Sequence, residues 1–374
     1  MVGQPVYKKI FDDLLGKIHS GHLKPGDRLP SELDLCRTYD VSRITGKKAL
    51  ELLAAQGYIS RSPGKGSFVI SAFGQSGDSL LKAIGFVLPD FSEAFGNRLL
   101  YGIEESCTQL GYHLILKRTR DQAGQEEEAI KSLSGAAGIL LLPVHGEFYN
   151  PEILKLILNR RPLVFVDRKL RGLAAPTVTT GNIDAAQAGA KFLVELGHRN
   201  IAFFSGPLMH TSTVEDRYQG FLRALTQFKI SHNPAYLCQE LSSIWTWPFY
   251  SPERISGDIR IAAKLLKDHP EISAAFTAEY AMAVIVKTAA ESLGRVIPKN
   301  FSILTFDAPP LVTDIPPITH ICQDEYTIGK ESVQALHRII TGSKPGADIM
   351  VPANFVKGAS TGPNEARKSK NQPK

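Results

Sequence analysis

Beyond residue 82 the chain alternates short, wholly apolar runs with longer stretches in which apolar residues recur every three or four positions. The short runs, such as 84–88 and 163–166, lack the alternation of a half-exposed strand and are typical of parallel strands covered by helices on both faces. We expect strands at 83–88, 113–116, 138–142, 163–167, 200–204, 274–277 and 302–307, and helices at 99–110, 126–133, 152–159, 185–196, 217–228, 259–266 and 282–293. Two such series predict an α/β fold with two lobes, each a doubly wound parallel sheet.

The residues that directly follow these strands predict where a ligand would bind. Parallel strands end at one edge of their sheet, and in a two-lobed protein these edges face the cleft between the lobes. Asp167 and Arg168, Asp307 and the segment 91–95 each follow a strand, so we expect all of them at the cleft. Asp307 could instead cap the turn formed by the prolines that follow it.

The first 70 residues carry a different pattern. Ser42 is a suitable N-cap for a helix that has Arg43 and Lys47 on one face and an apolar stripe on the other. A hairpin of two short strands is expected over residues 57–70, with a Gly-Lys-Gly tip at 64–66. Glycine allows close approach of the backbone, so this tip can bring a cation to a phosphate or into a narrow groove. The alternative is that the cations only form a solvated helix face.

Together with Pro25 to Glu32, these residues resemble the winged helix-turn-helix domain of the GntR family of bacterial repressors, over about residues 4–70. In that family the second helix of the pair enters the major groove of DNA and the wing tip approaches the minor groove. The resemblance implies these DNA-binding residues: Arg28, Ser31, Ser42, Arg43, Thr45, Lys47, Lys48, Gly64, Lys65 and Gly66. The chain departs from the family at Leu33, where many members have arginine, and at Gly46, where a branched apolar residue is usual. Gly46 would either allow closer packing on the neighbouring helix or loosen its own helix.

The larger part of the chain, about residues 82–362, resembles the effector-binding domain of LacI/GalR-family repressors. The similarity rests on the segments 84–90, 166–168 and 196–203 and on the R-x-x-G-F motif that begins at Arg217. It implies that this arginine anchors hydroxyl or carboxylate groups of a ligand. The same resemblance makes Asp307 the cleft aspartate and makes Asp167 and Arg168 a pair in the first lobe.

Charged planar groups suit the hydroxyl groups of a sugar, and an aromatic ring suits its apolar face. We therefore expect a small carbohydrate to be held by these effector-binding residues: Phe95, Asp167, Arg168, Thr213, Arg217, Trp245, Glu279 and Asp307. Arg217 could instead form a surface salt bridge. Trp245 could pack in a connection between the lobes.

Two departures from the LacI/GalR pattern prevent the choice of a particular sugar, and a third concerns the connection to DNA. Ala278-Glu279-Tyr280 stands where members often carry Asn-Asp, and Thr180-Gly181-Asn182 stands where Val-Asp-Asn is common. The hinge helix is replaced by the small, polar segment 71–81, which is typical of a flexible linker. Communication between the lobes and DNA is then expected to act through the geometry of a dimer.

Charge and cysteine content extend this interpretation. Residues 1–70 hold 11 Lys and Arg against 7 Asp and Glu, within a formal net charge of +6 for the chain, which favours a nucleic-acid partner for the N-terminal part. The four cysteines are scattered without metal-ligand spacing, so we expect reduced thiols, no metal and no cofactor. No apolar run of 18 residues and no export signal is found, so we expect a cytoplasmic protein without a membrane partner.

We expect four parts: a DNA-binding domain at 1–70, a linker at 71–81, an effector-binding and dimerisation domain at 82–362, and a basic, disordered tail at 363–374. These features predict a transcription regulator, most simply a repressor whose homodimer binds a palindromic operator in double-stranded DNA and is released by a sugar. Alternatively, the ligand promotes DNA binding as a corepressor, or it is a non-sugar such as a nucleoside. An enzyme acting on a sugar is a remote alternative, since the chain has no Walker loop, nucleophile elbow or zinc spacing. A second alternative to a regulator is a solute receptor of a transport system.

Overall fold

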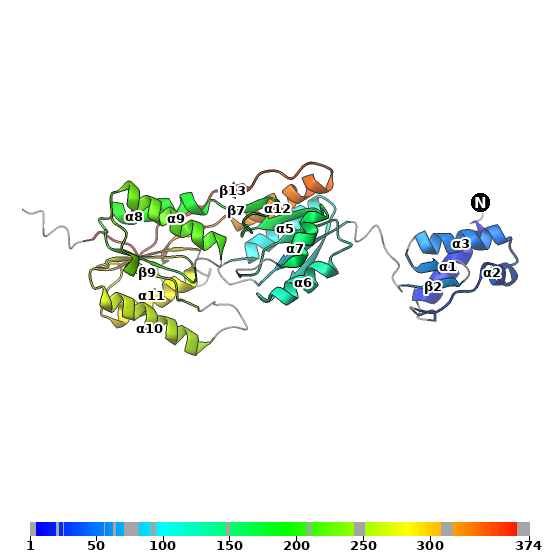
Figure 1. Ribbon diagram of the computed structural model, residues 1–374, viewed down its shortest axis with the longest axis horizontal. Helices are drawn as coiled ribbons and strands as arrows, with labels where there is room; N and C mark the ends of the chain where they lie inside the picture. Colours follow the sequence, from blue (N-terminus) through cyan, green and yellow to red (C-terminus); the bar gives the residue numbers. More distant parts are fainter. Residues whose placement is uncertain are drawn as a thin grey trace, which may run out of the picture. The chain divides into compact units, whose positions relative to one another are not determined.

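The computed structural model describes residues 5–19, 22–24, 26–55, 57–62, 65–70, 82–90, 95–146, 150–207, 211–242, 251–307 and 317–364. Gly64, Trp245, the linker 71–81 and most of the basic tail lie outside these residues. The chain divides into two compact units, Met1–Ala83 and Ile84–Lys374 (Figure 1). Within the described ranges, no helix has both the length and the apolar character needed to span a bilayer.

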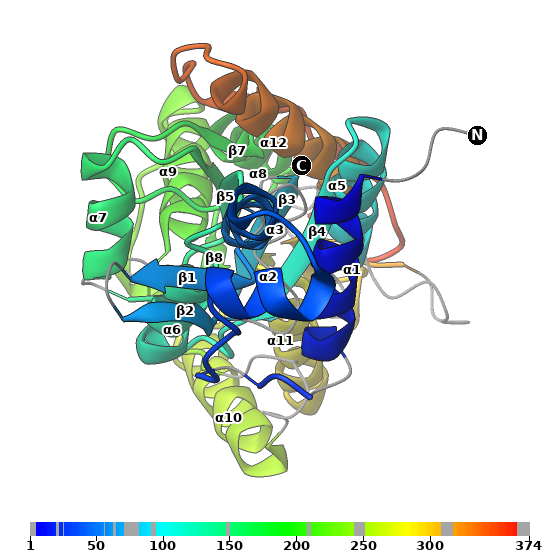
Figure 2. The same cartoon turned by 90° about the vertical axis from the view of Figure 1, so that its right-hand side faces the viewer.

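In its described residues the first unit contains three helices and a hairpin, which Figure 2 shows side by side. Its elements are α1 (Val6–His19), α2 (Glu32–Tyr39), α3 (Arg43–Ala55), β1 (Ile59–Ser62) and β2 (Gly66–Val69). The two strands are antiparallel, and Ile59 of β1 stands opposite Val69 of β2. The predicted apolar stripe of α3 is confirmed, because its buried residues are Gly46, Ala49, Leu50 and Leu53. They pack against apolar residues of α1 and α2 in a small core of their own.

The glycine in α3 brings two helices close together. A Cβ atom at Gly46 would lie 3.3 Å from Cβ of Leu35 and 3.4 Å from the carbonyl oxygen of Glu32, both in α2. Of the two consequences expected from the sequence, the structure supports closer packing. A branched side chain at this position would force α2 and α3 apart.

The first lobe of the second unit is built on a six-stranded sheet with the order β13-β7-β6-β5-β3-β4. Its strands are β3 (Ala83–Leu88), β4 (His113–Arg118), β5 (Gly138–Leu141), β6 (Leu163–Val166), β7 (Thr177–Thr180) and β13 (Ile349–Val351). Its helices are α5 (Asn97–Gln109), α6 (Ala123–Ser132), α7 (Pro151–Leu158) and α12 (Glu325–Ile340). Side chains alternate along the strands: Phe86 packs in the cluster formed with α5 and α12, and Val87 packs in the cluster formed with α6 and α7.

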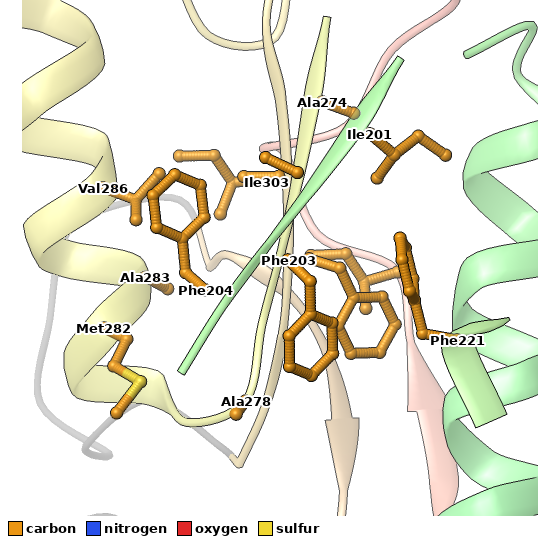
Figure 3. Close-up of a cluster of buried hydrophobic side chains, with 14 of the residues drawn as sticks. Ile201, Phe203, Phe204, Phe221, Ala274, Ala278, Met282, Ala283, Val286 and Ile303 are labelled. Carbon is orange, nitrogen blue, oxygen red and sulfur yellow. The ribbon is translucent and has the colours of Figure 1, made fainter. Parts of the chain in front are cut away.

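The second lobe has a sheet with the order β14-β12-β11-β10-β8-β9. Its strands are β8 (Ile201–Phe204), β9 (Leu237–Cys238), β10 (Ala274–Thr277), β11 (Ser302–Phe306), β12 (Thr319–Cys322) and β14 (Asn354–Val356). Its helices are α8 (Asn182–Glu195), α9 (Ser212–Gln227), α10 (Pro252–Asp268) and α11 (Tyr280–Ser292). Figure 3 shows the same alternation: Phe203 points toward Phe221 of α9, and Phe204 points toward Val286 of α11. The predicted two-lobed α/β fold is confirmed.

The lobes are not two consecutive halves of the chain, as the sequence pattern suggested. The chain passes from β7 in the first lobe to α8 in the second, returns from β12 to α12, and passes again from β13 to β14. Sequence reasoning missed this because β7 reads Thr-Val-Thr-Thr and β13 has only three residues, so neither gives the signal of a buried apolar strand. Three crossing segments therefore join the lobes.

Candidate DNA-binding surface and ligand cavity

The exposed face of α3 carries the cations that the sequence singles out. Arg43 is the first residue of the helix and its side chain is 72% exposed; Lys47 follows one turn later. Arg43 Nε lies 3.0 Å from Glu32 Oε2, and Arg61 of the hairpin lies 2.7 Å from Glu32 Oε1. These hydrogen bonds, led by that of Arg43, lower the pKa of Glu32. An anion that binds Arg43 must compete with this carboxylate.

Serine hydroxyl groups on this surface accept hydrogen bonds from N–H groups in the first turns of α2 and α3. Ser31 is the N-cap of α2: its Oγ accepts from the N–H of Asp34, and the Asp34 carboxylate accepts from the N–H of Ser31. Ser42 Oγ lies 3.4 Å from the N–H of Thr45 and 2.9 Å from the Thr45 hydroxyl oxygen. Ser31 and Ser42 are exposed, so capping leaves them accessible to a partner of the head.

Two neighbouring residues on α3 have surroundings that the sequence did not predict. Lys48 Nζ lies 4.2 Å from the centre of the Tyr7 ring, so this cation packs against α1 in a cation–π contact. Ile44, which sequence reasoning did not select, is 78% exposed beside Arg43. Sequence reasoning could have selected Ile44, because it is a large apolar residue outside the buried stripe of the helix.

The hairpin of β1 and β2, which is the predicted wing, contacts Arg28 in the segment that precedes α2. Gly66 has φ of 116°, and a Cβ atom there would lie 2.7 Å from Nε of Arg28. Arg28 also forms an isolated antiparallel bridge with Phe68 of β2. Lys65 is exposed immediately before β2. Arg28, Gly66 and Lys65 therefore lie close together at the end of the hairpin.

A cavity of about 620 Å³ lies between the two lobes of the second unit. It is lined by Pro89, Asp90, Phe95, Arg120, Asp121, Gln122, Leu142, His145, Asp167, Arg168, Gly206, Pro207, Thr211, Thr213, Val214, Arg217, Leu241, Ser242, Arg254, Glu279, Met282, Asp307 and Gln323. All the predicted effector-binding residues except Trp245 are among them. No group of three or more potential metal-ligating side chains occurs in the described parts of the chain.

Arg217 is buried and fixed from three sides. Its Nε donates to Oδ1 of Asn182 at 2.8 Å, and NH1 donates to the carbonyl oxygen of Ala278 at 2.7 Å. The guanidinium carbon lies 4.1 Å from the centre of the Phe306 ring. The surface salt bridge considered from the sequence is not what the structure has, since the side chain of Arg217 is only 3% exposed. Its remaining N–H groups are available to a ligand in the cavity.

Asp307 connects the cavity to the segments that join the lobes. Gln323 Nε2 donates to Asp307 Oδ1, and Gln323 Oε1 accepts from the Thr180 hydroxyl at 2.7 Å. Thr180 and Gln323 lie in two of the three crossing segments. Burial raises the pKa of Asp307 to about 7, and Arg217 opposes this shift while Glu279 adds to it. Asp307 is thus poised between its neutral and ionised forms near neutral pH.

Asp167 and Arg168 offer one unpaired acceptor and one unpaired donor. Among the described residues, Asp167 Oδ1 and Arg168 Nε are buried without a hydrogen-bond partner. Burial raises the pKa of Asp167, and the nearby charge of Arg168 opposes this. Asp167 and Asp307 both have positive φ, 62° and 72°, a conformation that costs free energy and is enriched at ligand sites. A ligand that donates and accepts hydrogen bonds would satisfy both atoms.

His145 completes the first-lobe wall of the cavity. Its backbone N–H donates to Asp121 Oδ1 at 2.8 Å, and its Nδ1 lies 2.9 Å from Asp121 Oδ2. The same Nδ1 lies 3.2 Å from NH1 of Arg168. One ring nitrogen cannot donate to Asp121 and accept from Arg168 at once, so this wall has two hydrogen-bond arrangements.

Sequence reasoning missed several polar residues of the cavity. The main ones are Asp90, Arg120, Asp121, Gln122, His145, Ser242, Arg254 and Gln323. Four of them, Asp90 and residues 120–122, follow strands β3 and β4, so the rule that selected Asp167 could have found them. Arg254 lies in the first turn of α10 and carried no such signal.

The fold and these two sites define a class: a winged helix-turn-helix head joined to a two-lobed, ligand-binding α/β domain. The family model "Bacterial regulatory proteins, gntR family" matches residues 6–69, and the model "Periplasmic binding protein-like domain" matches residues 190–361. The chain therefore has a GntR-family DNA-binding head and a periplasmic-binding-protein-like domain. The two resemblances inferred from the sequence are confirmed.

The chain is similar to several transcription regulators. It is 26% identical to the arabinose metabolism transcriptional repressor of Geobacillus stearothermophilus, over 81% of this chain and 82% of that protein. It is 26% identical to the ribose operon repressor of Haemophilus influenzae, over 68% of this chain and 73% of that protein. Among solved structures, the transcriptional regulator CelR in complex with cellobiose superimposes with a TM-score of 0.65 at 20% identity, over 86% of this chain and 91% of that one.

Proposed function

We propose that this protein is a cytoplasmic, homodimeric transcription regulator, most simply a repressor, that releases a palindromic operator when a small carbohydrate binds between its lobes. The observation that carries the proposal is the union in one chain of a GntR-type head and a two-lobed domain with unpaired polar atoms in its cavity. The relatives are named as transcriptional repressors of arabinose and ribose functions, which supports this.

The cavity supports a polyhydroxylated ligand. A hydroxyl group both donates and accepts, so a sugar can give a hydrogen to Asp167 Oδ1 and accept one from Arg168 Nε. Arg217, Glu279 and Asp307 add further donors and acceptors. The cellobiose held by a regulator of the same fold agrees with this ligand class.

The same cavity suggests how the signal reaches DNA. A ligand that touches both lobes favours the arrangement of lobes in which all its contacts are made, and it shifts the population by its difference in affinity for the two arrangements. In a dimer, a changed arrangement alters the spacing of the two heads. Heads that no longer match half-sites about one helical turn apart, or a multiple of that, bind the operator less tightly.

The alternatives concern whether the ligand weakens or strengthens DNA binding, and whether the ligand is a sugar. A ligand that favours the DNA-binding arrangement would be a corepressor, and a nucleoside could also satisfy the unpaired atoms. We infer that the protein is not an enzyme, because the named relatives are transcription regulators.

Two measurements test this function. A thermal-shift screen against sugars finds the ligand, since a ligand at 100 times its Kd stabilises the folded state by about 2.7 kcal/mol. Operator fragments selected from random DNA then report the response by fluorescence anisotropy. We expect Arg43→Ala to weaken operator binding without changing ligand affinity, and Arg217→Ala to abolish the response without changing basal operator binding.

Arg223→Ala is the matched control, because Arg223 lies on the same helix as Arg217 but is exposed outside the cavity. A normal response in Arg217→Ala would contradict the site, and loss of DNA binding in Arg217→Ala alone would indicate a structural role instead.

A further inference from the structure

The cavity carries two arginines that form no ion pair with a carboxylate among the described residues. Arg120, two residues after β4, belongs to the first lobe, and Arg254, in the first turn of α10, belongs to the second. Both side chains are exposed in the cavity. In the portion of the chain that the structure describes, neither guanidinium group has an ion pair or hydrogen bond with another residue.

Three carboxylates that line the cavity or adjoin these arginines in the sequence have other partners. Asp121 binds the backbone and ring of His145. Asp90 pairs with Arg118. Glu253 accepts a hydrogen bond from the Ser251 hydroxyl at 2.8 Å. Among the described residues, the positive charge of Arg120 and Arg254 is therefore available to a bound group.

The other carboxylates of the cavity are electrostatically tied to a different arginine. Arg217 opposes the raised pKa of both Asp167 and Asp307, and Glu279 adds to the shift of both. These carboxylates and Arg217 form one polar group suited to hydroxyls. Arg120 and Arg254 line the same cavity, one from each lobe, and neither belongs to this group.

We propose that the effector carries a carboxylate or phosphate group in addition to its hydroxyls, and that Arg120 and Arg254 bind this anion from opposite lobes. The inference rests on the proposed function and names the ligand class: a sugar acid or a sugar phosphate. Guanidinium groups bind both anions through charge-assisted, often bidentate hydrogen bonds.

The placement on opposite lobes also gives the anion a mechanical effect. Bringing two like charges together is unfavourable, so the arginines oppose closure of the empty cavity. An anion between them turns this repulsion into attraction. The ligand thus gains affinity for the closed arrangement specifically, as a ligand that shifts a conformational equilibrium must.

Matched ligands test the proposal by isothermal titration calorimetry on the full chain. The probes are arabinose, ribose, glucose and galactose, each with its 5- or 6-phosphate, and the two hexoses also with their uronates. We expect at least one anion to bind about tenfold or more tighter than its neutral parent, and Arg120→Gln or Arg254→Gln to remove this preference. Arg260→Gln is the control, because Arg260 is an exposed arginine of α10 outside the cavity.

The outcomes separate this proposal from the proposed function. If a neutral sugar binds as tightly as its anionic partner, or if Arg120→Gln and Arg254→Gln keep the preference for the anion, the anion site is refuted and the sugar-responsive regulator stands. If no probe of either kind binds, both the anion site and the carbohydrate effector are refuted. A loss of preference in Arg260→Gln would also contradict the assignment.

Discussion

Gln323 offers the sharpest test of how the cavity is connected to the segments between the lobes. Replacing it with leucine keeps most of the volume but removes the amide that donates to Asp307 and accepts from Thr180. A hydrogen bond to a charged group contributes about 2 kcal/mol and one between neutral groups about 1 kcal/mol. We therefore expect Gln323→Leu to lower the free energy of unfolding of the second unit by about 3 kcal/mol where Asp307 is ionised.

The loss of unfolding free energy caused by Gln323→Leu should be larger at high pH than at low pH. Because the pKa of Asp307 is raised to about 7, the carboxyl group is neutral at about pH 5.5 and its bond to Gln323 is then an ordinary one. The hydrogen bond from Gln323 lowers the pKa of Asp307, so its removal must destabilise the ionised state more. We expect the cost of Gln323→Leu to fall from about 3 kcal/mol at about pH 8.5 to about 2 kcal/mol at about pH 5.5.

The assay is urea unfolding of the full chain followed by tryptophan fluorescence. Both tryptophans, Trp245 and Trp247, belong to the second unit, so the signal does not report the DNA-binding head. Thr180→Val is the matched control, since it removes only the neutral bond and should cost about 1 kcal/mol at either pH. A cost of Gln323→Leu below about 1 kcal/mol, or one equal at both pH values, would refute the reasoning.

Three further predictions concern the two sites. Arg43→Ala should reduce the slope of log K against log salt for operator binding by about 1, as expected for one lost phosphate contact, and an unchanged slope would argue for a base contact. Ile44→Ala should cost about 1 kcal/mol on an operator with a thymine methyl at this position and nothing on the uracil-substituted DNA, which anisotropy measures directly. Effector affinity should rise with pH up to about 7, because ionised Asp307 accepts better from a hydroxyl, and Asp307→Asn should flatten this profile; a slope that persists in Asp307→Asn would assign it to another group.

Local patterns were sufficient to predict most of the fold. The apolar runs of β3, β5, β6, β8, β10 and β11 are buried on both faces, so periodicity alone identifies them. The buried stripe of α3 follows equally from a period of 3.6 residues. The return of α12 and β13 to the first lobe could not be predicted. The two lobes have similar sheets, and packing rather than the local sequence pattern determines which sheet these elements join.

The candidate cavity was predicted where a residue directly follows an apolar strand, as Asp167 and Asp307 do. Gln323 also follows a strand, but β12 reads Thr-His-Ile-Cys and was not recognised as one. Arg254 comes from the start of a helix, and only the three-dimensional arrangement brings it to the cavity. Lys48 stays a predicted DNA contact, and its contact with Tyr7 of α1 could not be predicted because it is tertiary.

The interleaving of the lobes has a consequence for biosynthesis. Until residues 325–351 have been made, the first lobe lacks α12 and β13, and the apolar residues of its sheet that pack on Ile328, Val333 and Leu336 have no cover. A nascent or truncated chain that stops at β12 therefore exposes a continuous apolar surface and is open to aggregation and proteolysis. Both lobes are completed only after the last crossing segments, which carry α12, β13 and β14, have been made.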